Sequence, residues 1–464
     1  MRRIRRSSRR RSSIGSQLYD HRPRRHPSAA AITVGCVKQT STTVRRTYYV
    51  LTAGNTLAAS LIWGINTIFL LDAGLSNFQA FAANAFFTAG MVLFEIPTGI
   101  VADRWGRRAS FLCGTLTLAA TTGLYVLLWQ LRSGFVWWAI VSALLGLGFT
   151  FFSGATEAWL VDALTATRFD GQLEGVFARG QVFGGAMMLS GSVAGGYLAQ
   201  LTNLGVPYVL RGGILIGVFV LALFAMHDIG FTPDRGEKPL TEMRRIVDSS
   251  VEHGLKVPAV RATMLAGFFS GGVGIYVFYA LQPYLLELWG NPRAYGIAGL
   301  VAAISAGAAI VGGLLTERIR GAFRRRTSAL LITTSVSVLM LVVIGMAGTF
   351  WLVVAAITIS GLAESASRPI RQAYLNGMIP SQQRATILSF DSLIDNAGGI
   401  VAQPALGKSA DVWGYPTSYL LSAAGTALAL PFIVRARRLN TPADRQTGPL
   451  PATQETSSVK EIDT

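Results

Sequence analysis

Long apolar runs separated by short polar loops fill most of the chain. A helix needs about 20 apolar residues to cross a bilayer, and twelve runs reach or approach that length. The pattern therefore predicts an all-α integral membrane protein with twelve transmembrane helices. The predicted spans are residues 47–71, 78–101, 109–131, 134–163, 174–199, 207–228, 262–288, 294–315, 328–348, 350–376, 384–409 and 415–435.

The spans form two groups of six, separated by a longer polar segment. Both ends of the chain are polar, and the first is rich in arginine and serine, a composition typical of disorder. Within the central segment, TEMRRIVDSSVEHGL predicts an amphipathic helix at the membrane surface. The predicted organisation is a basic, disordered, cytosolic tail at 1–46, a six-helix bundle at 47–228, a cytosolic central loop at 229–261, a second six-helix bundle at 262–436 and a disordered cytosolic tail at 437–464.

Charge placement predicts the orientation of these helices. The chain has a formal net charge of +17, which in a soluble protein would suggest a nucleic-acid partner, yet only 14% of its residues are charged and 51% are hydrophobic. With the N-terminus in the cytosol, sixteen lysines and arginines fall in inside loops, and only Arg132, Arg293 and Lys408 fall in outside loops. This bias follows the positive-inside rule. It predicts a multi-pass protein of the cell membrane with both termini cytosolic and no nucleic-acid partner.

Short motifs recur in the two groups of spans at similar offsets. The stretch from Gly99 to Arg104 follows the second span, and a related stretch from Gly313 to Arg318 follows the eighth. Glu157 in the fourth span matches Glu364 in the tenth, and the segment 191–195 in the fifth resembles 403–407 in the eleventh. The chain is therefore predicted to be two pseudo-symmetric six-helix bundles, an architecture in which transporters bind solutes between the halves.

GIVADRWGRR, residues 99–108, resembles the signature G-x-x-x-D-R-x-G-R-R that the major facilitator superfamily carries between its second and third helices. The segment Gly191-Ser192-Val193-Ala194-Gly195-Gly196 resembles the glycine-rich motif of the drug-exporting branch, with serine in place of proline. This resemblance extends over residues 47–436 and implies a secondary transporter that works by alternating access. We expect Gly191, Gly195 and Gly196 to serve close helix packing.

The same resemblance implies a conformational latch in the loop after the second span. Gly99 would let that span end tightly against a neighbour. Asp103 would bind the positive N-terminal end of the eleventh helix, and Arg104 or Arg108 would pair with Asp162. The alternative is that these charges only end the helix and set its topology.

Ionisable residues at membrane depth mark candidate substrate or proton pathways. Asp391 and Asp395 are four residues apart, so two like charges share a helix face and favour proton uptake. Arg179 is predicted as their counter-charge from the other half. Glu364 and Arg368 are also four apart and would neutralise each other. The full candidate set is Glu95, Glu157, Arg179, Glu364, Arg368, Asp391 and Asp395.

Glu157 and Glu364 are predicted to face the central cavity from opposite halves. Glu157 has no basic residue within four positions, so it is predicted to be the buried acid that takes up a proton. Other roles remain open: Asp391 as a wall residue of an inner cavity, Arg179 reaching toward the headgroups, and Glu95 capping a helix break before Pro97.

The sequence contains no G-x-x-x-x-G-K-[ST] motif for ATP, and its four histidines are not spaced as metal ligands. We therefore expect no enzyme activity, cofactor or metal. The predicted function is proton-coupled export of small, largely apolar compounds by a monomer, with the solute, protons and the bilayer as partners. The alternatives are proton-coupled uptake of a polar metabolite, held by Glu364, Arg368 and Arg179, or a non-transporting receptor that reuses the fold.

Overall fold

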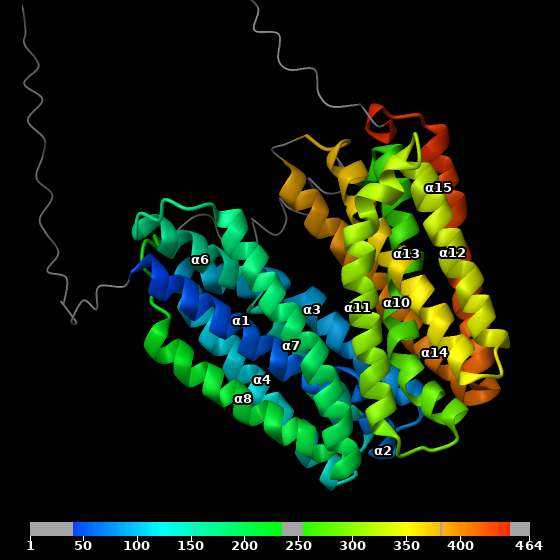
Figure 1. Ribbon diagram of the computed structural model, residues 1–464, viewed down its shortest axis with the longest axis horizontal. Helices are drawn as coiled ribbons and strands as arrows, with labels where there is room; N and C mark the ends of the chain where they lie inside the picture. Colours follow the sequence, from blue (N-terminus) through cyan, green and yellow to red (C-terminus); the bar gives the residue numbers. More distant parts are fainter. Residues whose placement is uncertain (1–39, 153, 234–253, 381–382, 446–464) are drawn as a thin grey trace, which may run out of the picture. The chain divides into compact units, whose positions relative to one another are not determined.

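The computed structural model describes residues 40–152, 154–233, 254–380 and 383–445, and this part of the chain is almost entirely helical (Figure 1). The first half contains α1 (Ser41–Trp63), α2 (Asn66–Asp72), α3 (Asn77–Trp105), α4 (Arg107–Gln130), α5 (Phe135–Thr150), α6 (Ala155–Ala166), α7 (Leu173–Leu201) and α8 (Gly205–Ala225). The second half contains α10 (Pro258–Trp289), α11 (Tyr295–Gly321), α12 (Arg326–Met346), α13 (Phe350–Asn376), α14 (Arg384–Ala427) and α15 (Ala429–Arg438).

These helices confirm the predicted fold class. Ten helical segments are long and apolar enough to cross a membrane, and α1 with α2, bent by 48°, makes an eleventh. Gly414 has φ 78° and ψ 168°, a conformation that interrupts α14. Because glycine adopts positive φ without steric cost, this kink separates the last two spans. The described residues thus contain twelve membrane-crossing segments.

Two predicted boundaries are wrong in detail. The first helix begins at Ser41 rather than at residue 47, because the Thr40 hydroxyl accepts a hydrogen bond from the Thr43 amide at 3.3 Å and caps the helix. The final helix continues to Arg438, and a 3₁₀ turn follows at Pro442–Asp444, so the segment from 437 to 445 is ordered. Residues 1–39 and 446–464, and most of the predicted amphipathic helix in the central loop, lie outside the described residues.

The two halves pair their helices in the same way. In the first half α1 packs against α7 and α8, and in the second half α10 packs against α14 and α15. Between the halves, α3 lies against α14 and α7 lies against α11. α3 and α11 occupy equivalent places in the two halves, and so do α7 and α14. The two contacts across the interface are therefore equivalent, as the predicted internal repeat requires.

Small residues allow these close approaches. A Cβ added to Gly195 would collide with the Leu61 carbonyl oxygen of α1, and one on Gly191 would collide with the Ser60 hydroxyl. Gly196 instead faces the other half, where an added Cβ would lie 2.6 Å from the Tyr295 carbonyl oxygen of α11. The three glycines therefore lie where α7 meets both α1 and α11.

Hydrogen bonds between the halves gather at one end of the molecule. We call the end near α2, which includes residues 72–77, 130–135, 201–205 and 289–295, the α2 side; the opposite end, where α1 begins and α15 ends, is the terminus side. On the α2 side, Asp411 of α14 accepts hydrogen bonds from the backbone amides of Asn77 and Phe78 at 2.8 and 2.9 Å. Gln200 of α7 accepts one from the Gly296 amide of α11 at 2.9 Å. Deeper along the same helices, the Gln403 side chain of α14 donates to the Thr88 hydroxyl of α3 at 3.3 Å.

Gln282 of α10 secures the break between α1 and α2. Its side-chain oxygen accepts from the Thr67 amide at 3.0 Å, and its amide nitrogen donates to the Trp63 carbonyl at 2.8 Å. A helix break in lipid leaves backbone groups without partners, and each such group is costly unless another side chain satisfies it. Gln282, only 3% exposed, supplies both partners from the second half.

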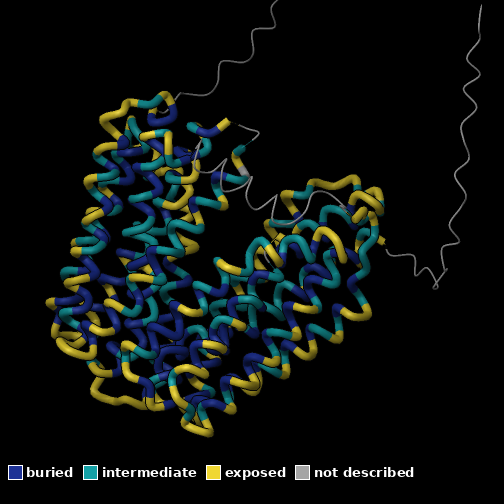
Figure 2. Tube along the Cα trace, turned by 180° about the vertical axis from the view of Figure 1, so that it is seen from behind, coloured by how far each residue is buried: buried dark blue, intermediate teal, exposed yellow. Residues whose placement is uncertain are grey.

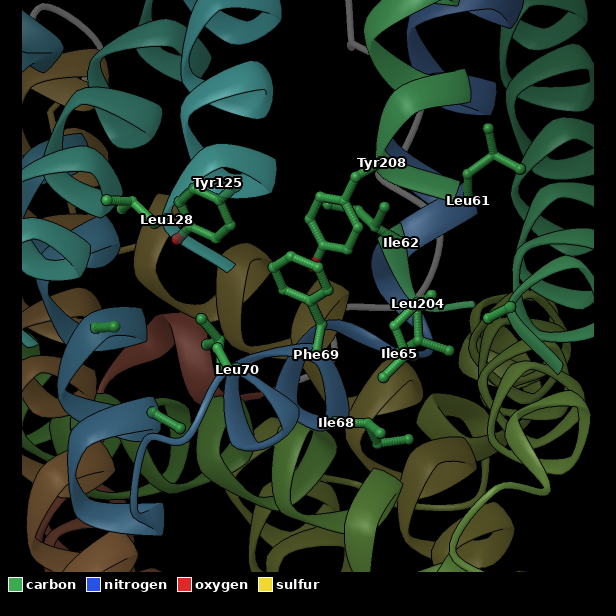
Figure 3. Packing of buried hydrophobic residues seen from close by; sticks show 14 of the residues in the cluster. Leu61, Ile62, Ile65, Ile68, Phe69, Leu70, Tyr125, Leu128, Leu204 and Tyr208 are labelled. Atoms are coloured by element: carbon green, nitrogen blue, oxygen red, sulfur yellow. The ribbon is translucent and has the colours of Figure 1, made fainter. Parts of the chain in front are cut away.

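Aromatic packing holds α2 inside the first half. The Phe69 ring stacks on Tyr208 of α8 with centroids 4.0 Å apart, and Tyr125 of α4 lies beyond it (Figure 3). Figure 2 shows buried positions concentrated between the helices, with exposed positions along their outer faces and at their ends. The exposed faces remain rich in large apolar side chains, as expected for helices that contact lipid.

Candidate functional site

Three charged side chains meet inside the second half. Arg371 of α13 lies between Asp391 and Asp395 of α14 and binds both carboxylates. Its two terminal nitrogens are 2.6 and 2.8 Å from the Asp391 oxygens, and 3.1 and 3.2 Å from the Asp395 oxygens. Both contacts are bidentate, a geometry that only the planar guanidinium of arginine offers. We call these three residues the Arg371 triad.

The two aspartates of the triad differ in their surroundings. The Asp391 side chain is 8% exposed and has the shorter contacts, whereas Asp395 is 32% exposed and has the longer ones. The formal charge of the triad is −1, because one guanidinium faces two carboxylates. Asp391 is therefore the main counter-ion of Arg371, and Asp395 is the second, more accessible acid.

Gly267 of α10 provides the space for the triad. A Cβ at this position would collide with an Asp395 oxygen and with a terminal nitrogen of Arg371. One turn later, a Cβ on Gly271 would make only an ordinary contact, 3.4 Å from the Asp395 Cβ. α10 also contributes the Thr263 carbonyl, which accepts a hydrogen bond from Arg371 at 3.4 Å.

The triad lines a cavity of about 370 Å³ that we call the triad cavity. Glu364 and Arg368 line the same cavity and form an ion pair at 3.4 Å, with 40% and 73% of their side chains exposed. Positions 364, 368 and 371 share one face of α13, because side chains three, four and seven residues apart lie above one another. The polar lining also includes Thr263, Ser270, Thr334, Ser367, Gln372, Ser392 and Asn396.

A second, smaller cavity adjoins the triad cavity through Ser270 and Glu364, which line both. Its volume is about 140 Å³, and its walls are more apolar, with Val273, Val277, Phe278, Leu341 and Ile357. Phe278 stacks on Trp63 of the first half, with ring centroids 4.3 Å apart. This apolar cavity therefore lies against the helix break of α1.

The structure corrects the predicted partner of the two aspartates. Arg179 lies exposed on α7, and Arg371, from the same half as the aspartates, occupies the predicted counter-charge position. The sequence held a signal for Arg371, since it lies seven residues after Glu364 inside the same predicted span. Pairing within one half also avoids breaking a buried ion pair each time the halves separate.

Two other predicted acids have different surroundings from those expected. Glu157 is exposed rather than buried, and it lines neither cavity. Gly154, with φ 67°, interrupts the helix before α6. The buried residues of α6 are then Ala155, Thr156, Trp159, Leu160, Ala163 and Leu164. Glu95 caps no break, because α3 continues through Pro97 without interruption.

The loop between α3 and α4 places the predicted latch residues on the terminus side. Asp103 pairs with Arg107 at 2.6 Å and is 51% exposed. A Cβ added to Gly99 would meet no atom within 4 Å, so the prediction that this glycine permits tight packing of the second span is wrong. Asp103, in the last turn of α3, thus pairs with the first residue of α4, and the described residues provide no contact between Asp103 and the start of α14.

Arg108 does not pair with Asp162 as predicted. Its amide donates to the Asp228 carboxylate at 2.8 Å, and its guanidinium donates to the Leu223 carbonyl at the end of α8. Burial raises the pKa of the Asp228 carboxyl, and the hydrogen bond from the Arg108 amide opposes that shift. Among the described residues, neither Arg104 nor Arg108 forms an ion pair with Asp162.

Bacterial proteins resemble this chain over two thirds of its length or more. It is 23% identical over 407 residues to the uncharacterized MFS-type transporter YxaM of Bacillus subtilis (strain 168), covering 83% of this chain and 94% of that protein. It is 26% identical over 320 residues to the multidrug resistance protein MdtG of Salmonella dublin, covering 67% of this chain and 73% of that protein.

Solved structures show the same fold. The nucleoside transporter NupG aligns with a TM-score of 0.68 at 12% identity, covering 84% of this chain and 98% of that one. A bacterial homologue of the human lysosomal transporter Spinster, in an inward-facing and unoccupied conformation, aligns with a TM-score of 0.66 at 15% identity, covering 89% and 100%. The family model of the Major Facilitator Superfamily matches residues 48–344 and 263–461. The chain therefore belongs to the Major Facilitator Superfamily and is a membrane transporter rather than an enzyme.

Proposed function

We propose that this transporter couples the movement of a small amphiphilic compound to protons, and that Asp395 is the proton-binding group. The observation that carries this proposal is the Arg371 triad, in which one guanidinium faces two carboxylates next to a cavity. Asp391 alone neutralises Arg371. The second acid can then change its protonation state without leaving a cation unpaired.

The energetics favour this division of roles. Removing the partner of a buried charge is strongly destabilising, by about 3–5 kcal/mol. The Asp391 side chain is 8% exposed, so this penalty opposes any loss of its contact with Arg371. Protonation of Asp395 leaves a one-to-one pair between Arg371 and Asp391, which is neutral overall. Its longer contacts and greater exposure make Asp395 the acid that protons and cargo can reach from the triad cavity.

The cavities indicate the kind of cargo. The triad cavity has both polar and apolar walls, the adjoining cavity is mostly apolar, and Ser270 and Glu364 lie where the two cavities meet. A compound with an apolar body and a cationic or hydrogen-bonding group matches this division. Export of such compounds is also supported by the likeness to MdtG, whose name describes multidrug resistance.

Uptake of a polar metabolite is the second candidate. It is favoured by the polar lining of the larger cavity, where Glu364, Arg368 and Arg371 offer both charges to a solute. The two candidates differ in the direction of the proton gradient that drives accumulation, so one assay distinguishes them.

The access cycle follows from the hydrogen bonds between the halves. Asp411, Gln200 and Gln282 join the halves on the α2 side, so this side is closed. We propose that the terminus side faces the cytosol of a cell membrane, in agreement with its loop arginines, so the structure is the cytosol-open state. In the opposite state Asp103 would engage the start of α14, and the two bundles, 47–228 and 262–436, would rock about the site in a single monomer.

The test is a gradient experiment with the purified chain in phospholipid vesicles. A panel of labelled cationic amphiphiles and polar metabolites is offered to vesicles with an acidic or an alkaline lumen, with and without a proton uncoupler. Proton antiport predicts that an amphiphile accumulates in acid-lumen vesicles, and that the uncoupler abolishes the accumulation. Accumulation of a metabolite in alkaline-lumen vesicles would establish proton symport instead. Equal uptake with and without the uncoupler would contradict proton coupling.

A further inference from the structure

A strap at the end of the described chain folds back over the start of α12. The Asp444 carboxylate is fully buried and accepts hydrogen bonds from the Thr327 amide at 2.8 Å and the Thr327 hydroxyl at 2.9 Å. Arg326 donates to the Ala443 carbonyl. Arg325 and Arg445 form an antiparallel β-bridge through their backbones. The strap therefore fixes the ends of α11, α12 and α15 next to one another on the terminus side.

This arrangement gathers arginines around two open cavities. The first, of about 650 Å³, is lined by Arg324, Arg325 and Arg445 together with the end of α11. The second, of about 530 Å³, is lined by Arg325, Arg437, Arg438, Asn440, Leu331 and Val434. Arg325 lines both. We call the pair the arginine cavities.

The positive charge here is not balanced within the described chain. None of the five arginines of the arginine cavities forms an ion pair with a described carboxylate. Asp444 is the nearest acid along the strap, and its two oxygens are occupied by Thr327. Holding like charges together without a counter-ion is unfavourable, and guanidinium groups remain charged at any physiological pH. An anion from beyond the described residues would therefore stabilise this site.

The apolar part of the lining identifies the source of that anion. Leu331 and Val434 lie in the membrane-crossing helices α12 and α15, and the arginines lie at the ends of those helices. The second cavity thus has an apolar wall toward the bilayer and a cationic wall at its surface. Basic pockets between membrane helices match the headgroups of anionic lipids. We propose that the arginine cavities bind the phosphate-containing headgroup of an anionic phospholipid, with its acyl chains along α12 and α15.

The site is tested by lipid binding to the purified full-length protein. Native mass spectrometry measures the fraction of protein that carries phosphatidylglycerol or phosphatidylcholine over a concentration series, with and without inorganic phosphate. We expect preferential binding of phosphatidylglycerol that inorganic phosphate displaces poorly. Arg325→Gln should weaken it about fivefold, since one arginine near an anionic surface contributes about 1 kcal/mol. The double variant Arg437→Gln/Arg438→Gln should weaken it further.

Arg435→Gln is the matched control, because Arg435 is exposed on α15 but lines neither cavity. It should bind phosphatidylglycerol like the unmodified protein. An equal loss in Arg435→Gln would reduce the effect to general surface charge and overturn the proposal. Displacement by inorganic phosphate at matched concentration would show a site for soluble anions and overturn the lipid assignment. Unchanged affinity for phosphatidylglycerol in both Arg325→Gln and Arg437→Gln/Arg438→Gln would also overturn the lipid site.

Discussion

Asp411 accepts a hydrogen bond from the backbone amide of Asn77, the first residue of α3, at 2.8 Å. The two residues belong to different halves of the protein, so a helix of the first half is capped by a carboxylate of the second. Gln200 and Gly296 repeat this relationship between α7 and α11. Because free amides and a partial positive charge lie at a helix N-terminus, each cap stabilises only the state in which the α2 side is closed.

Asp411→Ala should shift the protein toward the state that is open on the α2 side. Loss of a helix cap costs about 1 kcal/mol, which changes the ratio of the two states about fivefold. Distances between spin labels placed across the α2 side, in a variant without native cysteines, measure that ratio.

Asp411→Asn serves as the control for this prediction. An asparagine oxygen can still accept from the Asn77 amide, so its effect should be smaller than that of alanine. Identical distance distributions for Asp411→Ala and the unmodified protein would show that the cap contributes nothing to the closed state.

Arg371→Gln should destabilise the folded protein by about 3–5 kcal/mol, because it leaves Asp391 buried next to Asp395 without a cation. The double variant Arg371→Gln/Asp391→Asn should recover part of this loss. Thermal unfolding in detergent measures these two variants and the single variant Asp391→Asn. If the losses of the two single variants simply add, the residues do not act as a pair.

Gly267→Ala should disturb the triad, whereas Gly271→Ala on the same helix should not. The Cβ at 267 would overlap Asp395 and Arg371, while the one at 271 finds ordinary contact distance. Overpacking costs about 1–3 kcal/mol and should reduce transport as well as thermal stability. If Gly267→Ala and Gly271→Ala had the same transport and thermal stability, Gly267 would not contact the triad and this packing would be wrong.

Asp103→Asn should lower transport strongly while expression and membrane insertion persist. If Asp103 latches the terminus side in the opposite state, its loss should leave cytosolic positions more accessible to cysteine labelling. In this structure Asp103 pairs with Arg107 at an exposed site, where an ion pair contributes little to stability, so the stability of the protein should hardly change. Near-normal transport by Asp103→Asn would contradict the latch and would mean that Asp103 only sets the topology of the helix.

The fold could be predicted from the sequence because membrane spans depend on local properties. Long apolar runs with arginines in alternate loops defined the segments, and duplicated motifs defined the halves. The cap by Asp411 could not be predicted in this way. It depends on which helix end of the other half lies next to α14, and this pairing is a tertiary property.

The site was predicted in part. Asp391, Asp395, Glu364 and Arg368 line one cavity, and their four-residue spacings indicated which faces to consider. Arg179 was the wrong counter-charge, because sequence offset between repeats does not show which cation lies within reach of a side chain. The burial of Glu157 was also wrong, since the helix break at Gly154 changes which face of α6 is packed.

Proton flux through the Asp395→Asn variant is the measurement that tests the proposed mechanism most directly. Vesicles with a pH-sensitive dye report proton flux when a transported compound is added, and exchange of labelled for unlabelled compound reports the access cycle separately. Asp395→Asn should keep exchange within about twofold and lose proton flux and gradient-driven accumulation at least tenfold, a change worth about 1.4 kcal/mol or more. Glu157→Gln should retain both activities. Full gradient-driven accumulation in Asp395→Asn, or its loss in Glu157→Gln alone, would contradict the assignment of the proton to the Arg371 triad.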